Sequence, residues 1–220
     1  MSVFLKKEFD DAGYTNEVFH ENVLSITDFL KEEELTEILD IIKKTPEEDW
    51  SIEYRKNLAR FCLEKFGRDD VENLVAEGKF EITKNWDDKN LNIVHEKISS
   101  ILQTRLGKLI KIADPTLELG GFGTLQRMQS GVQLISHTDQ HTDPSIKYAA
   151  ILYINDDYAD GTLFFKNKEN SDMKPKPGTL LIFPGNEEYE HGVRQVGEGP
   201  IRYVTVGFIK VINFYKNNKY

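Results

Sequence analysis

The spacing of apolar residues changes at Asp114-Pro115, and this change limits the folds open to the chain. Beyond this point, short apolar or alternating runs are separated by Gly, Pro and Asp, which is typical of strands joined by tight turns. Many short strands at this spacing predict a sandwich or barrel with antiparallel pairing. The predicted strands are Gly123 to Met128, Val132 to Ser136, Lys147 to Asn155, Thr162 to Lys166, Thr179 to Phe183 and Arg202 to Ile209.

Before Asp114 the apolar residues have helical spacing. A short strand is expected at 22–27, and a helix that ends before Pro46 follows it, with the apolar face Leu35, Ile38, Leu39 and Ile42. Two short helices are expected around 58–65 and 69–78. The longest helix is expected from about Asn90 to Ile112, and its apolar stripe is Val94, Ile98, Ile101, Leu102, Arg105 or Leu106, and Leu109.

We expect a single domain over residues 1–220, of the α+β class with a mainly β core. Residues 1–115 would be a helical support region with short strands, and residues 116–212 the β core. The 37 acidic and 28 basic residues give a net charge of -9, which argues against a broad nucleic-acid surface. The single cysteine excludes an intramolecular disulfide. No stretch approaches the ~20 apolar residues of a membrane span, so a soluble, cytoplasmic protein is expected.

The segment His137-Thr138-Asp139-Gln140-His141-Thr142-Asp143 contains a candidate metal site. Side chains two residues apart on an extended segment point to the same side, so His137 and Asp139 are expected to converge. A third ligand, His191, follows the buried-looking run Leu180 to Pro184. Two imidazoles and one carboxylate are the ligands of a facial iron(II) site, which leaves coordination positions open for oxygen chemistry.

Arg202 is expected inside the β core. Alternation along its strand places Arg202 on the same face as Val204, Val206 and Phe208. A cation in such a core requires an anionic partner. Because a guanidinium suits a carboxylate in bidentate geometry, the partner is either a carboxylate of a bound ligand or an internal Asp or Glu.

From about Leu125 to Phe208, the sequence resembles the iron(II)/2-oxoglutarate-dependent dioxygenases of the prolyl 4-hydroxylase type. The order of several motifs carries this resemblance, because each motif alone is common. The matching stretches are Gly131-x-x-Leu134-x-x-His137-x-Asp139, Ile151 to Asp156, Gly161 to Phe165, Lys174 to Gly178, Leu180 to Pro184, His191 and Arg202-Tyr203. Residues 22–44 also resemble the N-terminal segment of the family.

The resemblance implies a double-stranded β-helix, or jelly roll, with supporting N-terminal helices. It implies that His137, Asp139 and His191 bind iron(II). It also implies that Arg202 binds the distal carboxylate of 2-oxoglutarate, where many relatives have lysine, and that the Tyr153 hydroxyl assists. The cosubstrates would be 2-oxoglutarate and O2, with ascorbate as a further cofactor.

The implied reaction is hydroxylation of an unactivated C–H bond, with conversion of 2-oxoglutarate and O2 to succinate and CO2. Asp139 favours hydroxylation, because halogenating relatives leave this position vacant for halide. The implied substrate is a prolyl residue in a peptide or protein. Fold does not fix function, so a free amino acid, another small molecule or a nucleic-acid base is the alternative. Two further alternatives are a jelly-roll ligand-binding module without turnover and a cupin-type metalloenzyme that lacks 2-oxoglutarate.

The repeated His-Thr-Asp makes His141 and Asp143 an alternative ligand pair. The family's spacing into His137 and on to Tyr153 favours the first pair, and Asp143 before Pro144 is typical of a turn.

The roles of Arg127 and Arg194 are also left open by the sequence. Where relatives commonly carry a tyrosine, this chain has Arg127-Met128-Gln129, so Gln126 and Arg127 are both candidates for the inner carboxylate of 2-oxoglutarate. Arg194 is a second cation near His191, and we expect it at the rim of the site.

Overall fold

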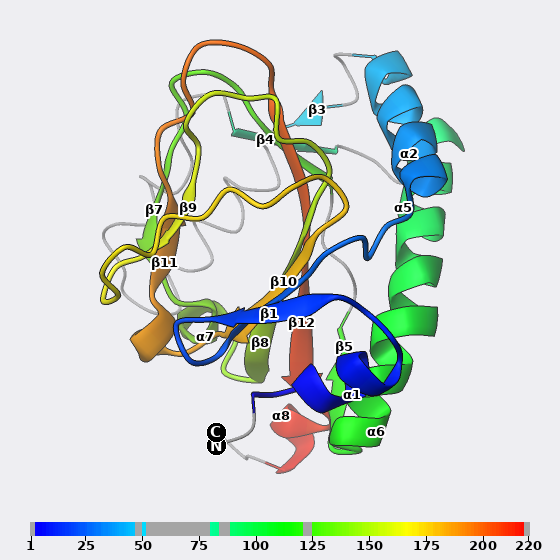
Figure 1. Cartoon of the computed structure of the whole chain (residues 1–220), viewed down its shortest axis with the longest axis vertical. Helices are drawn as coiled ribbons and strands as arrows, with labels where there is room; N and C mark the ends of the chain where they lie inside the picture. Colours follow the sequence, from blue (N-terminus) through cyan, green and yellow to red (C-terminus); the bar gives the residue numbers. More distant parts are fainter. Residues whose placement is uncertain (1–2, 47–49, 52–79, 84–88, 121–124, 218–220) are drawn as a thin grey trace.

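The computed structural model describes residues 3–46, 50–51, 80–83, 89–120 and 125–217 (Figure 1). The predicted helices around 58–65 and 69–78 lie outside the described residues. The helices and helical turns are α1 (Lys6–Asp11), α2 (Glu32–Lys44), α5 (Lys89–Leu102), η2 (Gln103–Gly107), α6 (Lys108–Ala113), α7 (Asp139–Thr142), η3 (Glu187–Tyr189) and α8 (Phe214–Asn217).

The described strands form two antiparallel sheets, one of nine strands and one of three. The larger sheet has the order β1-β2-β10-β8-β12-β6-β4-β3, with β5 paired to β12, and the smaller has the order β7-β11-β9. The strands are β1 (Asn16–Phe19), β2 (Val23–Ile26), β3 (Trp50–Ser51), β4 (Phe80–Thr83), β5 (Leu117–Leu119), β6 (Leu125–Met128), β7 (Leu134–His137), β8 (Ile146–Tyr153), β9 (Leu163–Phe165), β10 (Leu180–Pro184), β11 (His191–Val193) and β12 (Arg202–Val211).

The strands predicted beyond Asp114 are confirmed as β6 to β10 and β12. The sequence did not predict β5 or β11, because three residues are too few to show an alternating pattern. Several of the observed strands begin or end one or two residues from the predicted bounds, which is the usual uncertainty of such boundaries.

Two hydrophobic clusters show that the molecule has three layers. One cluster joins Phe9 of α1, Ile38 of α2 and Ile98 of α5 to one face of the larger sheet. The other cluster lies between the two sheets and joins Ile151 of β8 to Phe165 of β9. Figure 1 shows the same arrangement, with α2, α5 and α6 on one side of the larger sheet and β7, β9 and β11 on the other.

The long predicted helix is present as α5, η2 and α6, but a π-helical turn interrupts it at Gln103–Gly107. Ile98, Ile101, Leu102 and Leu106 are buried as predicted. Leu109 is partly buried and packs against the same core, and Ile110, which the sequence did not predict, is fully buried. The buried residues Leu102, Leu106 and Ile110 follow one another at four-residue spacing, so one face of the interrupted helix stays against the core.

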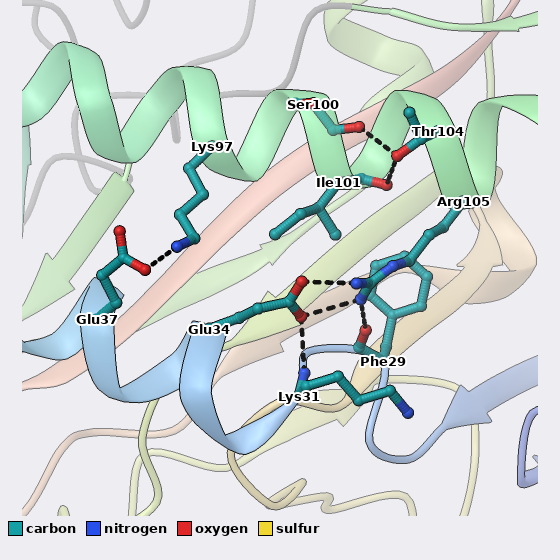
Figure 2. A network of polar contacts seen from close by, with 9 residues as sticks. All are labelled: Phe29, Lys31, Glu34, Glu37, Lys97, Ser100, Ile101, Thr104 and Arg105. Atoms are coloured by element: carbon teal, nitrogen blue, oxygen red, sulfur yellow. Dashed lines mark hydrogen bonds and ion pairs between the residues drawn. The ribbon is translucent and has the colours of Figure 1, made fainter.

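A carboxylate at the start of α2 ties this helix to η2 (Figure 2). Glu34 accepts hydrogen bonds from Arg105 Nη2 at 2.6 Å and Nη1 at 3.1 Å. It also accepts one from the Lys31 backbone N–H at 2.8 Å, which satisfies a free donor at the helix N-terminus. Among the described helices, none has the length and apolarity that crossing a membrane demands.

Candidate active site

Two histidines meet across the smaller sheet. His137 is the last residue of β7 and His191 the first of β11, and the two are directly opposite each other in the antiparallel register. Residues opposite each other across an antiparallel pair project from the same face. The ring centroids are accordingly 4.6 Å apart, and His191 is buried.

Asp139 completes a group of three, although not as an extended residue. The strand ends at His137, Thr138 keeps an extended backbone, and Asp139 is the first residue of the helical turn α7. The predicted convergence still holds, since Asp139 Oδ1 lies 3.9 Å from His137 Nε2 and Oδ2 lies 3.9 Å from His191 Nε2. One potential ligand atom from each residue lies within 4.8 Å of the others, and the group is suited to a metal ion.

The backbone orients both imidazoles. His137 Nδ1 is 3.1 Å from the Ile135 carbonyl oxygen, and His191 Nδ1 is 3.0 Å from that of Tyr189. A carbonyl oxygen can only accept, so Nδ1 carries the proton in both rings and Nε2 presents a lone pair toward Asp139. Burial lowers the pKa of His191 to about 4, so this ring is neutral near pH 7. Neutral imidazoles are the form that binds metals.

A second group of polar side chains surrounds Arg202 at the start of β12. Arg202 is 2% exposed, and its guanidinium carbon lies 5.3 Å from the ring centroid of Tyr153 and 5.8 Å from that of Tyr158. Its Nη1 donates to Met128 Sδ at 3.4 Å, a weak acceptor. Arg202 Nε, Tyr153 Oη and Tyr158 Oη are buried without a hydrogen-bond partner among the described residues.

These three buried polar atoms have no hydrogen-bond acceptor among the described residues, which indicates that a bound ligand supplies one. Burial raises the pKa of Tyr153 to about 12 against the opposing effect of Arg202, so its hydroxyl is a donor at ordinary pH. The described residues offer Arg202 no Asp or Glu within ion-pair distance, which argues against the internal partner that the sequence left open. One cation and two hydroxyls that converge without an acceptor fit a carboxylate.

The second His-Thr-Asp of the repeat lies elsewhere. His141 is half exposed, and its Nε2 is 3.4 Å from Glu187 Oε1. Asp143 follows α7, where the sequence predicted a turn, and accepts hydrogen bonds from Ser145, Lys210 and Tyr215. In the part of the chain that the structure describes, neither joins the group of potential metal ligands.

The register of β6 on β12 separates Gln126 from Arg127. Gln126 is opposite Val204, so it lies on the interior face with Arg202. Arg127 projects from the other face, where its guanidinium carbon lies 4.3 Å above the Trp50 ring. Gln126 therefore stays a candidate for contact with a ligand between the sheets, whereas Arg127 does not.

Arg194 also stands apart from the interior group. Its guanidinium makes two hydrogen bonds of 3.1 Å with Asp172, and both side chains are about half exposed.

Sequence reasoning missed two residues of this region. Tyr158 lies in a loop, where no periodicity marks a buried side chain. Asp143 was considered only as an alternative ligand, since two of the residues that it contacts, Lys210 and Tyr215, lie far along the chain.

Residues 123–210 match the family model of the 2OG-Fe(II) oxygenase superfamily. This match covers both candidate groups and the strands that carry them. These residues belong to the 2OG-Fe(II) oxygenase superfamily. A search of the curated proteins finds no relative of this oxygenase.

Solved structures confirm the fold of this 2OG-Fe(II) oxygenase. It is similar to a prolyl hydroxylase from Trichoplax adhaerens in complex with a peptide fragment of the hypoxia inducible factor oxygen degradation domain (TM-score 0.61, 14% identity, 99% of this chain and 92% of that one). It is also similar to an oxidoreductase of the 2OG-Fe(II) oxygenase family from Burkholderia pseudomallei (TM-score 0.58, 12% identity, 94% and 88%). The predicted jelly roll, α+β with a mainly β core, is confirmed, as is the class of 2-oxoglutarate-dependent dioxygenase.

Proposed function

We propose that His137, Asp139 and His191 hold the iron(II) of this oxygenase. The observation that carries the proposal is the convergence of one potential ligand atom from each residue within 4.8 Å. The donor set fits iron(II), because two neutral imidazoles and one carboxylate leave positions free for cosubstrate and oxygen. Both Nδ1–H groups are held by backbone carbonyls, which fixes each ring with Nε2 toward the metal position.

Arg202 and Tyr153 would bind the distal carboxylate of 2-oxoglutarate. The guanidinium supplies charge and paired donors, and the Tyr153 hydroxyl supplies a further donor at the same point. Tyr158 brings a second hydroxyl to this group. The surrounding side chains are buried and exclude water, which strengthens each of these contacts.

The reaction would be hydroxylation of an unactivated C–H bond. Bound iron supplies the activation of O2, one oxygen atom of which enters the substrate and the other the succinate formed from 2-oxoglutarate with release of CO2. Asp139 occupies the carboxylate position, which supports hydroxylation over halogenation. The jelly-roll likeness to a prolyl hydroxylase bound to a peptide supports a prolyl residue in a peptide or protein as substrate. Ascorbate dependence and a cytoplasmic location stay predictions.

Anaerobic addition of iron(II) and 2-oxoglutarate to the purified chain tests the site. We expect a weak visible charge-transfer band in the wild type, and its loss in the His137→Ala variant. If the band never forms, or if His137→Ala leaves it intact, the assignment of the metal site fails. The His141→Ala variant is the matched control, and it should keep the band.

Succinate release against a panel of proline-containing peptides tests the reaction. Stimulation by one peptide, with hydroxylation of its proline detected by mass spectrometry, supports the proposed substrate. Stimulation only by a free amino acid or a nucleobase would replace it with another substrate class. If the band forms but no substrate stimulates turnover, the ligand-binding module gains support. If Arg202→Ala leaves turnover unaffected, a metalloenzyme without 2-oxoglutarate is favoured.

A further inference from the structure

Asp143, the second aspartate of the His-Thr-Asp repeat, sits where α7 meets the larger sheet. It directly follows α7, and its backbone N–H donates to the Asp139 carbonyl oxygen at 3.0 Å. Its Oδ1 accepts from the Ser145 N–H at 2.9 Å, the Ser145 hydroxyl at 2.6 Å and the Tyr215 hydroxyl at 2.6 Å. Its Oδ2 accepts from Lys210 Nζ at 2.9 Å.

These donors come from three separate parts of the chain. Ser145 precedes β8, Lys210 lies near the end of β12, and Tyr215 belongs to α8. Both α7 and α8 lie at the same end of the two sheets (Figure 1). Asp143 therefore joins α7 to the residue before β8, to β12 of the larger sheet and to α8.

The carboxylate of Asp143 is held in its ionised form. Burial by itself raises the pKa of Asp143, but the hydrogen bonds from Ser145, Tyr215 and Lys210 outweigh burial and hold the pKa well below its usual range. With these donors already on its two oxygens, Asp143 has little capacity left to bind a metal.

Different elements of the fold hold the three proposed ligands in place. His137 and His191 are fixed to each other by the β7–β11 pairing of the smaller sheet. Asp139 belongs to α7, which contacts η3 through His141 and the larger sheet through Gln140. Gln140 donates from its backbone to Gly185 at 3.1 Å and from its side chain to the Ile146 carbonyl at 2.8 Å.

We propose that Asp143 is a positioning residue, which anchors α7 to the larger sheet and thereby sets the distance from the Asp139 carboxylate to the two histidines. This inference rests on the proposed metal site, and it assigns Asp143 no contact with metal or substrate. Outer residues that orient a metal ligand typically affect metal affinity by about 10- to 100-fold when they are replaced.

The test measures anaerobic iron(II) affinity and the charge-transfer band with 2-oxoglutarate, together with thermal unfolding of the metal-free chain. We expect Asp143→Asn to bind iron(II) about 10- to 100-fold more weakly and to shift or weaken the band. Tyr215→Phe removes one donor, and we expect a loss of affinity of about 2- to 10-fold. In the double variant the two losses should fall short of additivity, because both changes disturb one network.

The matched control is Glu34→Gln in α2, a helix on the opposite side of the larger sheet from β7 and β11 (Figure 1). This variant neutralises another partly buried and multiply hydrogen-bonded carboxylate (Figure 2). It should lower the unfolding temperature and leave iron(II) affinity and the band unchanged. If Asp143→Asn behaves like this control, Asp143 is purely structural and the proposal is overturned.

Two further outcomes are decided by the same set of proteins. If Asp143→Asn does not fold, the Tyr215→Phe and Lys210→Met variants test the proposal instead, since each keeps the Asp143 carboxylate and removes one of its donors. Weaker iron(II) binding in them supports the proposal, and wild-type binding overturns it. If the wild type itself binds no iron(II), the proposed function fails and the role of Asp143 fails with it. Wild-type binding that His137→Ala abolishes and Asp143→Asn leaves unchanged overturns the Asp143 proposal alone.

Discussion

We expect the Arg202→Met variant to bind 2-oxoglutarate far more weakly than the wild type and yet to be more stable without it. Removal of one partner from a buried, hydrogen-bonded charge pair costs about 3–5 kcal/mol. This cost corresponds to roughly 100- to 4,000-fold in the dissociation constant of 2-oxoglutarate. Met128 and the two tyrosines cannot replace the guanidinium, because none of them carries a positive charge.

The expected gain in stability without ligand follows from the surroundings of Arg202. A buried cation costs several kcal/mol of desolvation, and the described residues return only a hydrogen bond to sulfur and two ring contacts. Ring contacts of this kind contribute about 0.5–2 kcal/mol each. Replacement of a buried charge by a well-packed apolar side chain of similar volume commonly stabilises by about 1–4 kcal/mol. We expect a gain in this range for Arg202→Met in the absence of ligand.

Chemical denaturation with and without 2-oxoglutarate tests both the gain in stability and the loss of binding in one experiment. With anaerobic iron(II) present in both arms, 2-oxoglutarate at 100 times its wild-type Kd adds about 2.7 kcal/mol to the wild type and almost nothing to the variant. Isothermal titration gives the two dissociation constants directly. The reasoning is refuted if Arg202→Met loses several kcal/mol of stability without ligand while it binds 2-oxoglutarate like the wild type, since Arg202 would then be an internal structural partner.

Three further variants probe other parts of the fold. Tyr153→Phe should lower 2-oxoglutarate affinity in titration by about 2- to 10-fold and slightly raise stability without ligand, because the buried hydroxyl has no partner among the described residues to offset its desolvation. Gly192→Ala would place a Cβ 2.5 Å from the Leu134 carbonyl oxygen next to His191, so denaturation should show a loss of about 1–3 kcal/mol and titration weaker iron(II) binding. Burial raises the pKa of Glu34, but hydrogen bonds from Arg105 and the backbone outweigh it, so the native pKa lies below 4.5. The stability advantage of wild type over Glu34→Gln, about 1 kcal/mol, should hold above pH 4.5 and disappear in denaturation as the pH falls through the native value.

Much of the β core and of the candidate site could be predicted because local signals and spatial arrangement agree there. The predicted strands pair antiparallel as expected, and Asp139, His191 and Arg202 are buried, with His137 partly buried beside the first two. The strand alternation that placed Arg202 inside was also sufficient, because Arg202 lies at the start of β12, where its pairing with β6 shows no register shift. The same alternation separates Gln126 from Arg127 only once the partner strand and its register are known.

The remaining features could not be predicted, because they depend on contacts between distant segments or on small departures from regular geometry. The π turn at Gln103–Gly107 interrupts the long helix, and no residue type there predicts it. Asp143 shows the same limit at the site. Its sequence context matches that of Asp139, since both follow His-Thr, and the donors Lys210 and Tyr215 lie near the other end of the chain. Identical local motifs thus carry different chemistry, because one aspartate turns toward two histidines and the other toward a lysine and a tyrosine.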